Sequence, residues 1–185
     1  MKTIRFLTIM LTALSMGAAF AHLLEMPAKL RYDGPTWLHL LQTLYPPGFG
    51  TLGAACEVLA VVASLVLVVA TRIRRKAFPW TLLGFSCVLA SHAIFWIWVN
   101  PVNMTMVPLT PGTLVIDWTR LRDQWEFAHA SRAILQIVAL GAFVLSLLAE
   151  IPTADLPSSD KRRHDPTRGR ASNKVLQPTA QETQK

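Results

Sequence analysis

The sequence has few charged residues, and this scarcity narrows the class of protein. Charged residues make up 16% of the 185 residues and hydrophobic residues 52%. Soluble domains carry about a quarter of charged residues, so the composition excludes an ordinary soluble fold. The net charge of +7 would suit nucleic-acid binding. However, the basic residues lie between and after apolar runs, as in the cytoplasmic loops of membrane proteins. We therefore expect a lipid bilayer, and no nucleic acid, among the partners.

Cysteine is also scarce, which argues against redox chemistry based on thiols. The only two, Cys56 and Cys87, fit no zinc spacing and no paired redox motif. They belong to different predicted helices at different depths, so we expect no disulfide between them. Four-helix thiol–disulfide exchangers need a paired motif near the membrane surface, and this sequence does not provide one.

Long apolar runs are present where charge is absent. Four of them, at residues 4–24, 49–71, 80–99 and 127–148, match the roughly 20 residues that cross a bilayer core. We predict an all-α fold, with a four-transmembrane-helix bundle in residues 1–150. Residues 151–185 lack apolar periodicity and predict a disordered basic cytoplasmic tail. A signal peptide cleaved before His22 remains an alternative interpretation of the first run.

The basic residues predict how the chain is oriented in the membrane. Residues 72–76 contain four basic side chains and no acid, whereas the other two loops mix both signs. The positive-inside rule therefore places this loop and both termini in the cytoplasm, with the protein in an inner or plasma membrane.

The first outer loop predicts a short helix lying in the membrane interface. Asp33 suits an N-cap and Pro35 a first helical turn, and apolar residues then follow at helical spacing on one face. These apolar residues are Trp37, Leu38, Leu41, Leu44 and Tyr45. The second outer loop carries Pro101, Pro108 and Pro111 and predicts extended chain.

Ionisable residues within the predicted spans all fall in the outer half of the membrane. Such groups are costly in lipid, so they usually face the interior of the protein and mark function. Small residues accompany Glu57 and His22 on their helix faces, which suits close helix packing. We predict that six candidate catalytic residues on four helices converge into one pocket, with no comparable set in the inner half. These residues are His22, Glu57, His92, Glu126, His129 and Arg132. A purely structural ion pair remains an alternative for Glu57.

The spacing of two motifs raises the question of a metal. Glu126-x-x-His129 has the i, i+3 spacing of di-iron four-helix bundles, and His22-x-x-Glu25 is its reverse. Both motifs are too short to assign a metal by themselves. The sequence therefore assigns no metal ligands and leaves any cofactor unknown.

Three stretches form longer motifs. They are DWTRLRDQWE at residues 117–126 followed by His129 and Arg132, then HLLEMPAK at residues 22–29, and a weaker match over residues 45–57. These stretches resemble the anthrone-oxygenase-like integral membrane proteins, a family otherwise described as a domain of unknown function, across roughly residues 10–148. The resemblance implies a four-helix membrane fold. Fungal members are linked to the oxygenation of anthrones to anthraquinones without an evident cofactor.

Such chemistry requires a base, a group that stabilises an anion and a surface that holds a flat ring. His129 or His92 is the natural base, Arg132 would stabilise the anion, and Glu126 or Glu57 would orient the histidine. The residues that we assign to substrate binding are Trp96, Trp118, Trp125 and Arg122. The same tryptophans also fit an aromatic belt at the outer interface.

The leading hypothesis is therefore a membrane oxygenase or oxidoreductase, cofactor-independent or metal-assisted, that acts on a small apolar aromatic of the anthrone or quinol type. The alternative is a non-enzymatic membrane protein that binds a small molecule, a metal or a partner protein through the same pocket. A transporter ranks third, because four spans are few and no pair of broken helices is evident. The sequence does not set the oligomeric state.

The charge asymmetry makes a prediction about topology. Reporter fusions at Lys76 and at Lys185 should both report a cytoplasmic location, because the basic loop and the tail are expected to stay inside. An external report from either fusion, or a mature N-terminus at His22, would contradict the prediction.

Overall fold

The computed structural model describes residues 1–110 and 112–151, and this part of the chain is helical without strands. Pro111 and the predicted tail lie outside the described residues. The helices are α1 (Lys2–Lys29), α2 (Gly34–Thr43), α3 (Ala54–Thr71), α4 (Phe78–Ile94), α5 (Asn100–Met106) and α6 (Trp118–Leu148). Two π-helical turns, η1 (Phe49–Gly53) and η2 (Phe95–Val99), precede α3 and follow α4.

Four helical stretches are long and apolar enough to cross a membrane. They are Lys2–Lys29, Gly34–Thr71, Phe78–Met106 and Trp118–Leu148, which confirms the four predicted spans and a multi-pass membrane protein. The helices are longer than the sequence indicated, since α1 continues to Lys29 and α6 begins at Trp118. With 31 residues, α6 is about 46 Å long at about 1.5 Å per residue, beyond the roughly 30 Å of a bilayer core.

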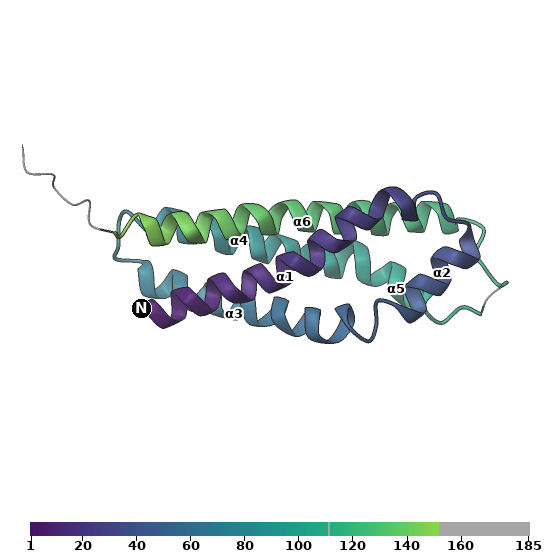
Figure 1. Cartoon of the computed structure of the whole chain (residues 1–185), viewed down its shortest axis with the longest axis horizontal. Helices are drawn as coiled ribbons and strands as arrows, with labels where there is room; N and C mark the ends of the chain where they lie inside the picture. The colour runs from purple at the N-terminus through teal and green to yellow at the C-terminus, as the bar shows by residue number, and fades with distance from the viewer. Residues whose placement is uncertain (111, 152–185) are drawn as a thin grey trace, which may run out of the picture. The chain divides into compact units, whose positions relative to one another are not determined.

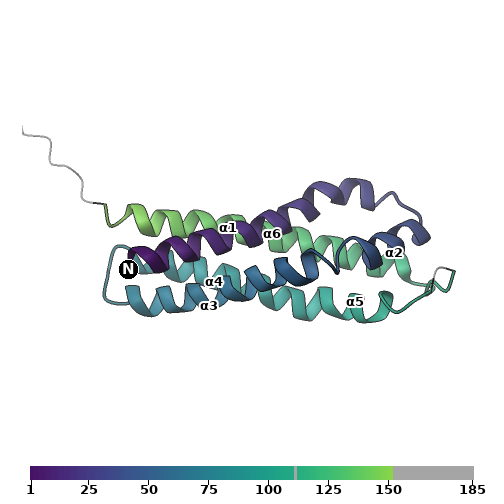
Figure 2. The same cartoon turned by 60° about the horizontal axis from the view of Figure 1, so that its bottom comes forward.

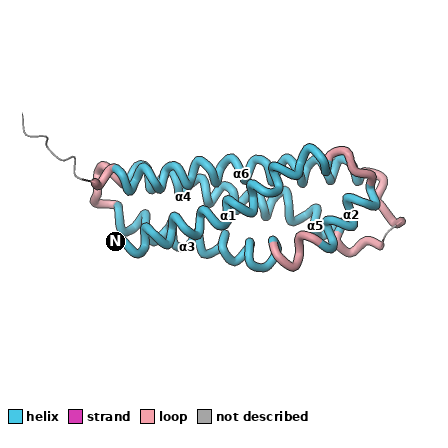
Figure 3. The backbone as a smooth tube through the Cα atoms, in the orientation of Figure 1, coloured by secondary structure: helices cyan, strands magenta, loops and turns pink. Residues whose placement is uncertain are grey.

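The four long helices α1, α3, α4 and α6 lie side by side (Figures 1 and 2). Helix α6 packs on α1 and α4, and α3 packs on the same two helices. Loops are confined to the ends of the long helices (Figure 3). Helices α2 and α5 gather at the end away from the N-terminus, which we call the cavity end; the opposite end is the N-terminal end.

The surface between the ends is apolar, as lipid contact requires. Large apolar side chains such as Leu14, Val62 and Ile134 are exposed on the outward helix faces, where a soluble protein would place polar residues. An apolar cluster packs in the interior midway along the helices, beside buried hydroxyls such as those of Thr12 and Ser64. It contains Ala60, Leu67, Cys87, Val88, Ala139 and Phe143.

The segment after α1 forms a helix, α2, where the sequence predicted one. Hydrogen bonding by Thr36, whose backbone N–H donates to Asp33 Oδ1 at 2.9 Å, caps the helix and lowers the pKa of the Asp33 carboxyl. The predicted apolar face is buried except for Leu44, which is exposed. Because the helix ends at Thr43, Leu44 falls in the turn that follows and no longer shares the buried face.

The expectation of extended chain after the third span is wrong for residues 100–106, which form α5. Pro101 occupies the first turn of this helix, where the missing N–H costs nothing and the fixed φ angle is helical. Val102 and Met106 are fully buried against Trp37 and Leu41 of α2. Tertiary packing therefore offsets the usual effect of proline as a helix breaker.

A second buried polar cluster lies at the N-terminal end, where the sequence predicted none. The buried Arg5 side chain donates to the Ser146 carbonyl at 2.9 Å and forms an ion pair with Glu150 at 2.8 Å. The Ser146 hydroxyl contacts Thr81 Oγ1 at 2.6 Å. The carbonyls at the end of α6 have no partner within the helix, and Arg5 satisfies one of them.

Close packing of α4 on α6 depends on the absence of a side chain at Gly84. A Cβ atom there would lie 2.5 Å from Cε1 of the buried Phe143. We expect Gly84→Ala to lower the free energy of unfolding by about 1–3 kcal/mol, as overpacking of a core usually does. Thermal unfolding in detergent measures the change. The control is Gly141→Ala on α6, where nothing lies within 4 Å, and equal effects of both variants would contradict this account.

Candidate functional site

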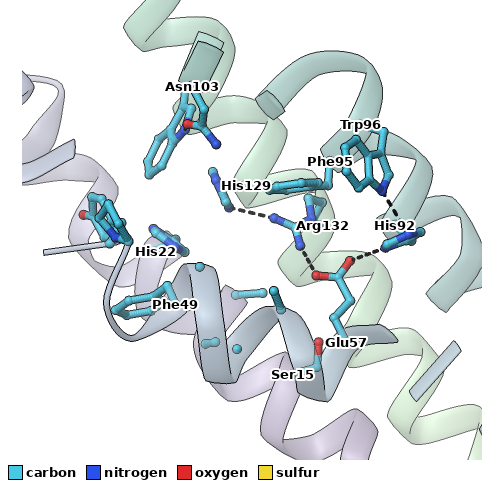
Figure 4. A pocket seen from close by; sticks show the side chains of 18 of the residues that line it. Ser15, His22, Phe49, Glu57, His92, Phe95, Trp96, Asn103, His129 and Arg132 are labelled. Atoms are coloured by element: carbon cyan, nitrogen blue, oxygen red, sulfur yellow. Dashed lines mark hydrogen bonds and ion pairs between the residues drawn. The ribbon is translucent and has the colours of Figure 1, made fainter. Parts of the chain in front are cut away.

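A cavity of about 420 Å³ lies inside the cavity end of the protein. Every helix contributes to its wall, as do both π-helical turns. Small residues of α1 and α3 (Ser15, Ala18, Ala19 and Ala54) line one side and leave the space that larger side chains would fill. Figure 4 shows the ionisable side chains gathered around this space.

The polar wall of the cavity is built on an ion pair between α3 and α6. Arg132 Nη2 donates to Glu57 Oε2, and both side chains are buried. Glu57 Oε1 lies 3.3 Å from Nδ1 of His92 on α4. Glu57 thus has both an arginine and a histidine as partners. Each charge is thereby compensated, as burial requires.

Hydrogen bonding fixes the tautomers of two histidines. Arg132 Nη1 lies 3.0 Å from Nδ1 of His129, and because a guanidinium only donates, this nitrogen must accept. The proton of His129 is therefore on Nε2. In His92 the assignment is reversed, because Nδ1 donates to the Glu57 carboxylate while Nε2 accepts from Trp96 Nε1 at 3.0 Å. Both assignments follow from the hydrogen-bond partners rather than from hydrogen positions.

His22 of α1 stacks on His129 at the back of the cavity. Their ring centroids are 4.1 Å apart with an interplanar angle of 30°. Tyr45 and Phe49 contact the His22 ring at 4.6 and 4.7 Å, and Trp125 contacts the His129 ring at 4.1 Å. The two imidazoles therefore lie inside an aromatic box, and Figure 4 shows both facing the same space.

Lys29 is a buried member of the site that the sequence reasoning missed. Only 2% of its side chain is exposed, and its Nζ lies 2.9 Å from Glu126 Oε2 and 3.5 Å from His22 Nδ1. From the sequence, this lysine was expected only among the mixed charges of the loop after the first span. A usable signal was the i, i+3, i+7 spacing of His22, Glu25 and Lys29, which puts all three on one helix face.

Five of the six predicted residues line the cavity, and Glu126 lies behind it. The five are His22, Glu57, His92, His129 and Arg132. Glu126 instead pairs with Lys29 and accepts a hydrogen bond from Trp37 Nε1 at 3.1 Å. Glu126 was predicted to orient His129 or His92, but its partners are Lys29 and Trp37, and Lys29 in turn contacts His22.

The four predicted substrate-binding residues divide into two pairs. Trp96 and Trp125 line the cavity, but Trp118 and Arg122 lie outside it. The Arg122 guanidinium sits 5.2 Å from the Trp118 ring and pairs with Asp123 at 2.9 Å. Direct contact of Trp118 and Arg122 with a ligand therefore has no support in the geometry of this cavity.

The two residues of the Glu126-x-x-His129 motif, which was considered for a metal, point in different directions. Glu126 turns toward Lys29 and Trp37, whereas His129 turns toward Arg132. Within residues 1–110 and 112–151, no three His, Cys, Asp or Glu side chains are arranged to hold a metal ion. Cys56 and Cys87 are free, as expected.

The cavity opens sideways, between η1–α3 and η2–α5. Val58 is 49% exposed, Trp96 57% and Met104 70%, although all three belong to its lining. These side chains are apolar or aromatic and lie on stretches apolar enough to span a membrane. On such stretches an exposed apolar surface faces lipid, so the mouth is suited to molecules dissolved in the bilayer.

Comparisons of the chain with protein-family models, with curated proteins and with solved structures found no match. The resemblance to the anthrone-oxygenase-like family therefore stays a hypothesis. The functional argument rests on the chemistry and geometry of the cavity.

The ion pair between Glu57 and Arg132 makes a prediction about stability. Arg132→Met should lower the free energy of unfolding by about 3–5 kcal/mol, because it leaves Glu57 buried without its cationic partner. Glu57→Gln should also destabilise, while the double variant should cost less than the sum of the two single changes. Chemical unfolding in detergent gives the three values. Simple additivity would show that the two charges do not stabilise each other.

Proposed function

We propose that this protein is a multi-pass membrane oxidoreductase whose cavity binds a small, flat, apolar aromatic molecule of the anthrone or quinol class and promotes its oxidation by O₂. The observation that carries the proposal is an aromatic cavity with one wall formed by the linked side chains of His92, Glu57, Arg132 and His129.

The aromatic walls suit a planar ring. Phe49, Tyr45 and Trp125 surround the histidine stack on one side, and Phe95 and Trp96 lie on the other. Aromatic faces bind flat rings by stacking and by burial of apolar area. A cavity of about 420 Å³ falls within the usual size range of small-molecule sites, about 300–1,000 Å³.

His92 is the side chain best placed to act as a base. Glu57 holds its Nδ1–H, so the lone pair on Nε2 is the basic one, as in the histidine of a carboxylate–histidine pair. Only Trp96 Nε1 covers that lone pair, and Trp96 is largely exposed at the cavity mouth. A substrate that displaces the Trp96 contact would then give a proton to Nε2, from the hydroxyl of a quinol or from the acidic ring carbon of an anthrone. His129, the other candidate base, has its Nδ1 lone pair occupied by Arg132.

Arg132 would stabilise the anion that results, since a fixed cation in a water-poor site lowers the energy of developing negative charge. The electron-rich anion then reacts with O₂. For an anthrone the overall change is anthrone + O₂ → anthraquinone + H₂O, in which two hydrogens leave the ring carbon, one oxygen atom enters as the new carbonyl and the other leaves as water. The proton taken by His92 returns to the departing oxygen.

The proposed setting is the outer half of an inner or plasma membrane, with both termini in the cytoplasm and α2 lying in the outer interface. The exposed, apolar mouth between Val58 and Met104 would admit the substrate from lipid. The basic loop at residues 72–76 supports this orientation.

Oxygen uptake and anthraquinone absorbance in the presence of anthrone test the proposal on purified protein in detergent. Wild type should accelerate the reaction above the uncatalysed rate, and His92→Gln should reduce the rate about 100-fold or more, the usual contribution of a general base. His39→Gln is the matched control, because His39 is exposed on α2 outside the cavity.

One outcome would count against the enzyme and another against the role of His92. No acceleration across a panel of anthrones and quinols, despite measurable binding, would favour the non-enzymatic alternative, a membrane protein that binds a small molecule. Unchanged turnover in His92→Gln would exclude His92 as the base and return that role to His129 or Glu57.

A further inference from the structure

We propose that Asn103 recognises a carbonyl oxygen of the ligand, through a side-chain amide that Trp125 holds in one orientation. The inference rests on the proposed function and deepens it, because it selects a keto aromatic such as an anthrone over a quinol or a hydrocarbon. Its test requires binding but no turnover, so the two proposals can fail separately.

The orientation of the Asn103 amide is fixed by the buried indole of Trp125. Trp125 Nε1 lies 2.8 Å from Asn103 Oδ1, and because an indole N–H only donates, the atom that faces it must be the amide oxygen. Packing holds Trp125 itself in place, since it is 2% exposed and lies edge-on to Trp37 with ring centroids 6.2 Å apart. The amide nitrogen, with two hydrogens to donate, therefore points away from Trp125.

The amide nitrogen of Asn103 is open to the cavity. Asn103 belongs to the lining and is partly exposed, and Figure 4 shows its nitrogen turned toward the space beside His129. Within residues 1–110 and 112–151, the side chain is bonded through its oxygen, and its nitrogen is not among the buried atoms that lack a partner. The nitrogen is therefore accessible, and a ligand oxygen can reach it.

The wall around Asn103 is otherwise apolar, so its amide is the group that can orient a ligand there. The other lining residues of α5 and of the turn after it are Met104 and Val107. Small-molecule sites are typically apolar, with a few placed polar groups that set the orientation of the ligand. Val102 and Met106 are fully buried against α2 and anchor α5, which gives the amide a fixed position.

A carbonyl oxygen is the acceptor on a flat aromatic that suits this donor best. A hydrocarbon offers no acceptor, and a phenolic oxygen accepts more weakly because its lone pair is delocalised into the ring. When the ring carbon of an anthrone loses its proton, negative charge develops on the carbonyl oxygen. A hydrogen bond from Asn103 to that oxygen would therefore strengthen as the anion forms.

The probe is 9-fluorenone, and fluorene is the matched ring system that lacks the carbonyl. On full-length protein in detergent, Asn103→Leu should weaken the binding of fluorenone about threefold to tenfold, the usual net contribution of one neutral hydrogen bond. The binding of fluorene should not change. Because each ligand is compared between variants in the same detergent, its partition into micelles cancels.

Infrared spectra of bound fluorenone give a readout that a merely structural role would not move. A hydrogen bond weakens the C=O bond, so the carbonyl stretch should lie at lower frequency in wild type than in Asn103→Leu. Asn100→Leu is the control, because Asn100 is also partly exposed on α5 but lies outside the cavity lining. It should match wild type in both affinities and in the stretch.

Asn103→Asp keeps the test decisive if Asn103→Leu loses stability by leaving Trp125 Nε1 without an acceptor. It retains an oxygen for Trp125. At a pH where its infrared spectrum shows an ionised carboxylate, it has no hydrogen to donate, so it should weaken fluorenone relative to fluorene as Asn103→Leu does.

Two results would overturn the proposal: an equal loss of both ligands in the Asn103 variants, or a carbonyl stretch that is the same in wild type and variants. Recognition of fluorenone through Asn103 without any oxidation of anthrones would support this site and remove the enzyme. Oxidation of anthrones with an unchanged carbonyl stretch would do the reverse.

Discussion

The buried ion pair between Glu57 and Arg132 is the interaction on which the rest of the cavity depends. An isolated charge in a bilayer core is costly, so the two side chains hold α3 and α6 at a fixed separation across the interior of the protein. Each also has a second partner. Glu57 contacts His92 of α4, and Arg132 contacts His129 and the ring of Phe95, 5.0 Å from its guanidinium carbon. One pair of charges thus positions three other lining side chains, His92, His129 and Phe95.

A second ion pair repeats this arrangement on the other side of the histidine stack. Lys29 of α1 joins Glu126 of α6, and Trp37 of α2 shares the same carboxylate. Helix α6 takes part in both pairs. It supplies the acid, Glu126, to the pair with α1 and the base, Arg132, to the pair with α3. The imidazoles of His22 and His129 lie between the two pairs, and each imidazole contacts one of the cations.

Much of this arrangement could be predicted from the sequence because depth in a membrane is a one-dimensional property. Counting residues from each predicted membrane surface placed Glu57, His92 and Arg132 at one level. The free-energy cost of exposing ionisable groups to lipid then predicted that they face the interior. The same reasoning failed for Lys29 and Arg5. A basic residue near the end of an apolar run looks the same whether it is solvated or buried, and only distant acids, Glu126 and Glu150, decide between the two.

The turns η1 and η2 and helix α5 were beyond prediction for a related reason. A π-helical turn in Phe95–Val99 has the same apolar composition as the α-helix on either side, and the register shift that it introduces leaves no compositional trace. Pro101 starts a helix because α5 can bury Val102 and Met106 against α2. That packing involves residues far apart in the chain, which local spacing cannot reveal.

The interior between the two polar clusters is not uniformly apolar. Leu67, Val88 and Phe143 pack there, and the buried hydroxyls of Thr12 and Ser64 lie on the same stretches of α1 and α3. A hydroxyl turned toward lipid would be costly, so these two residues favour the inward orientation of their helix faces and help to set the rotation of α1 and α3 about their own axes.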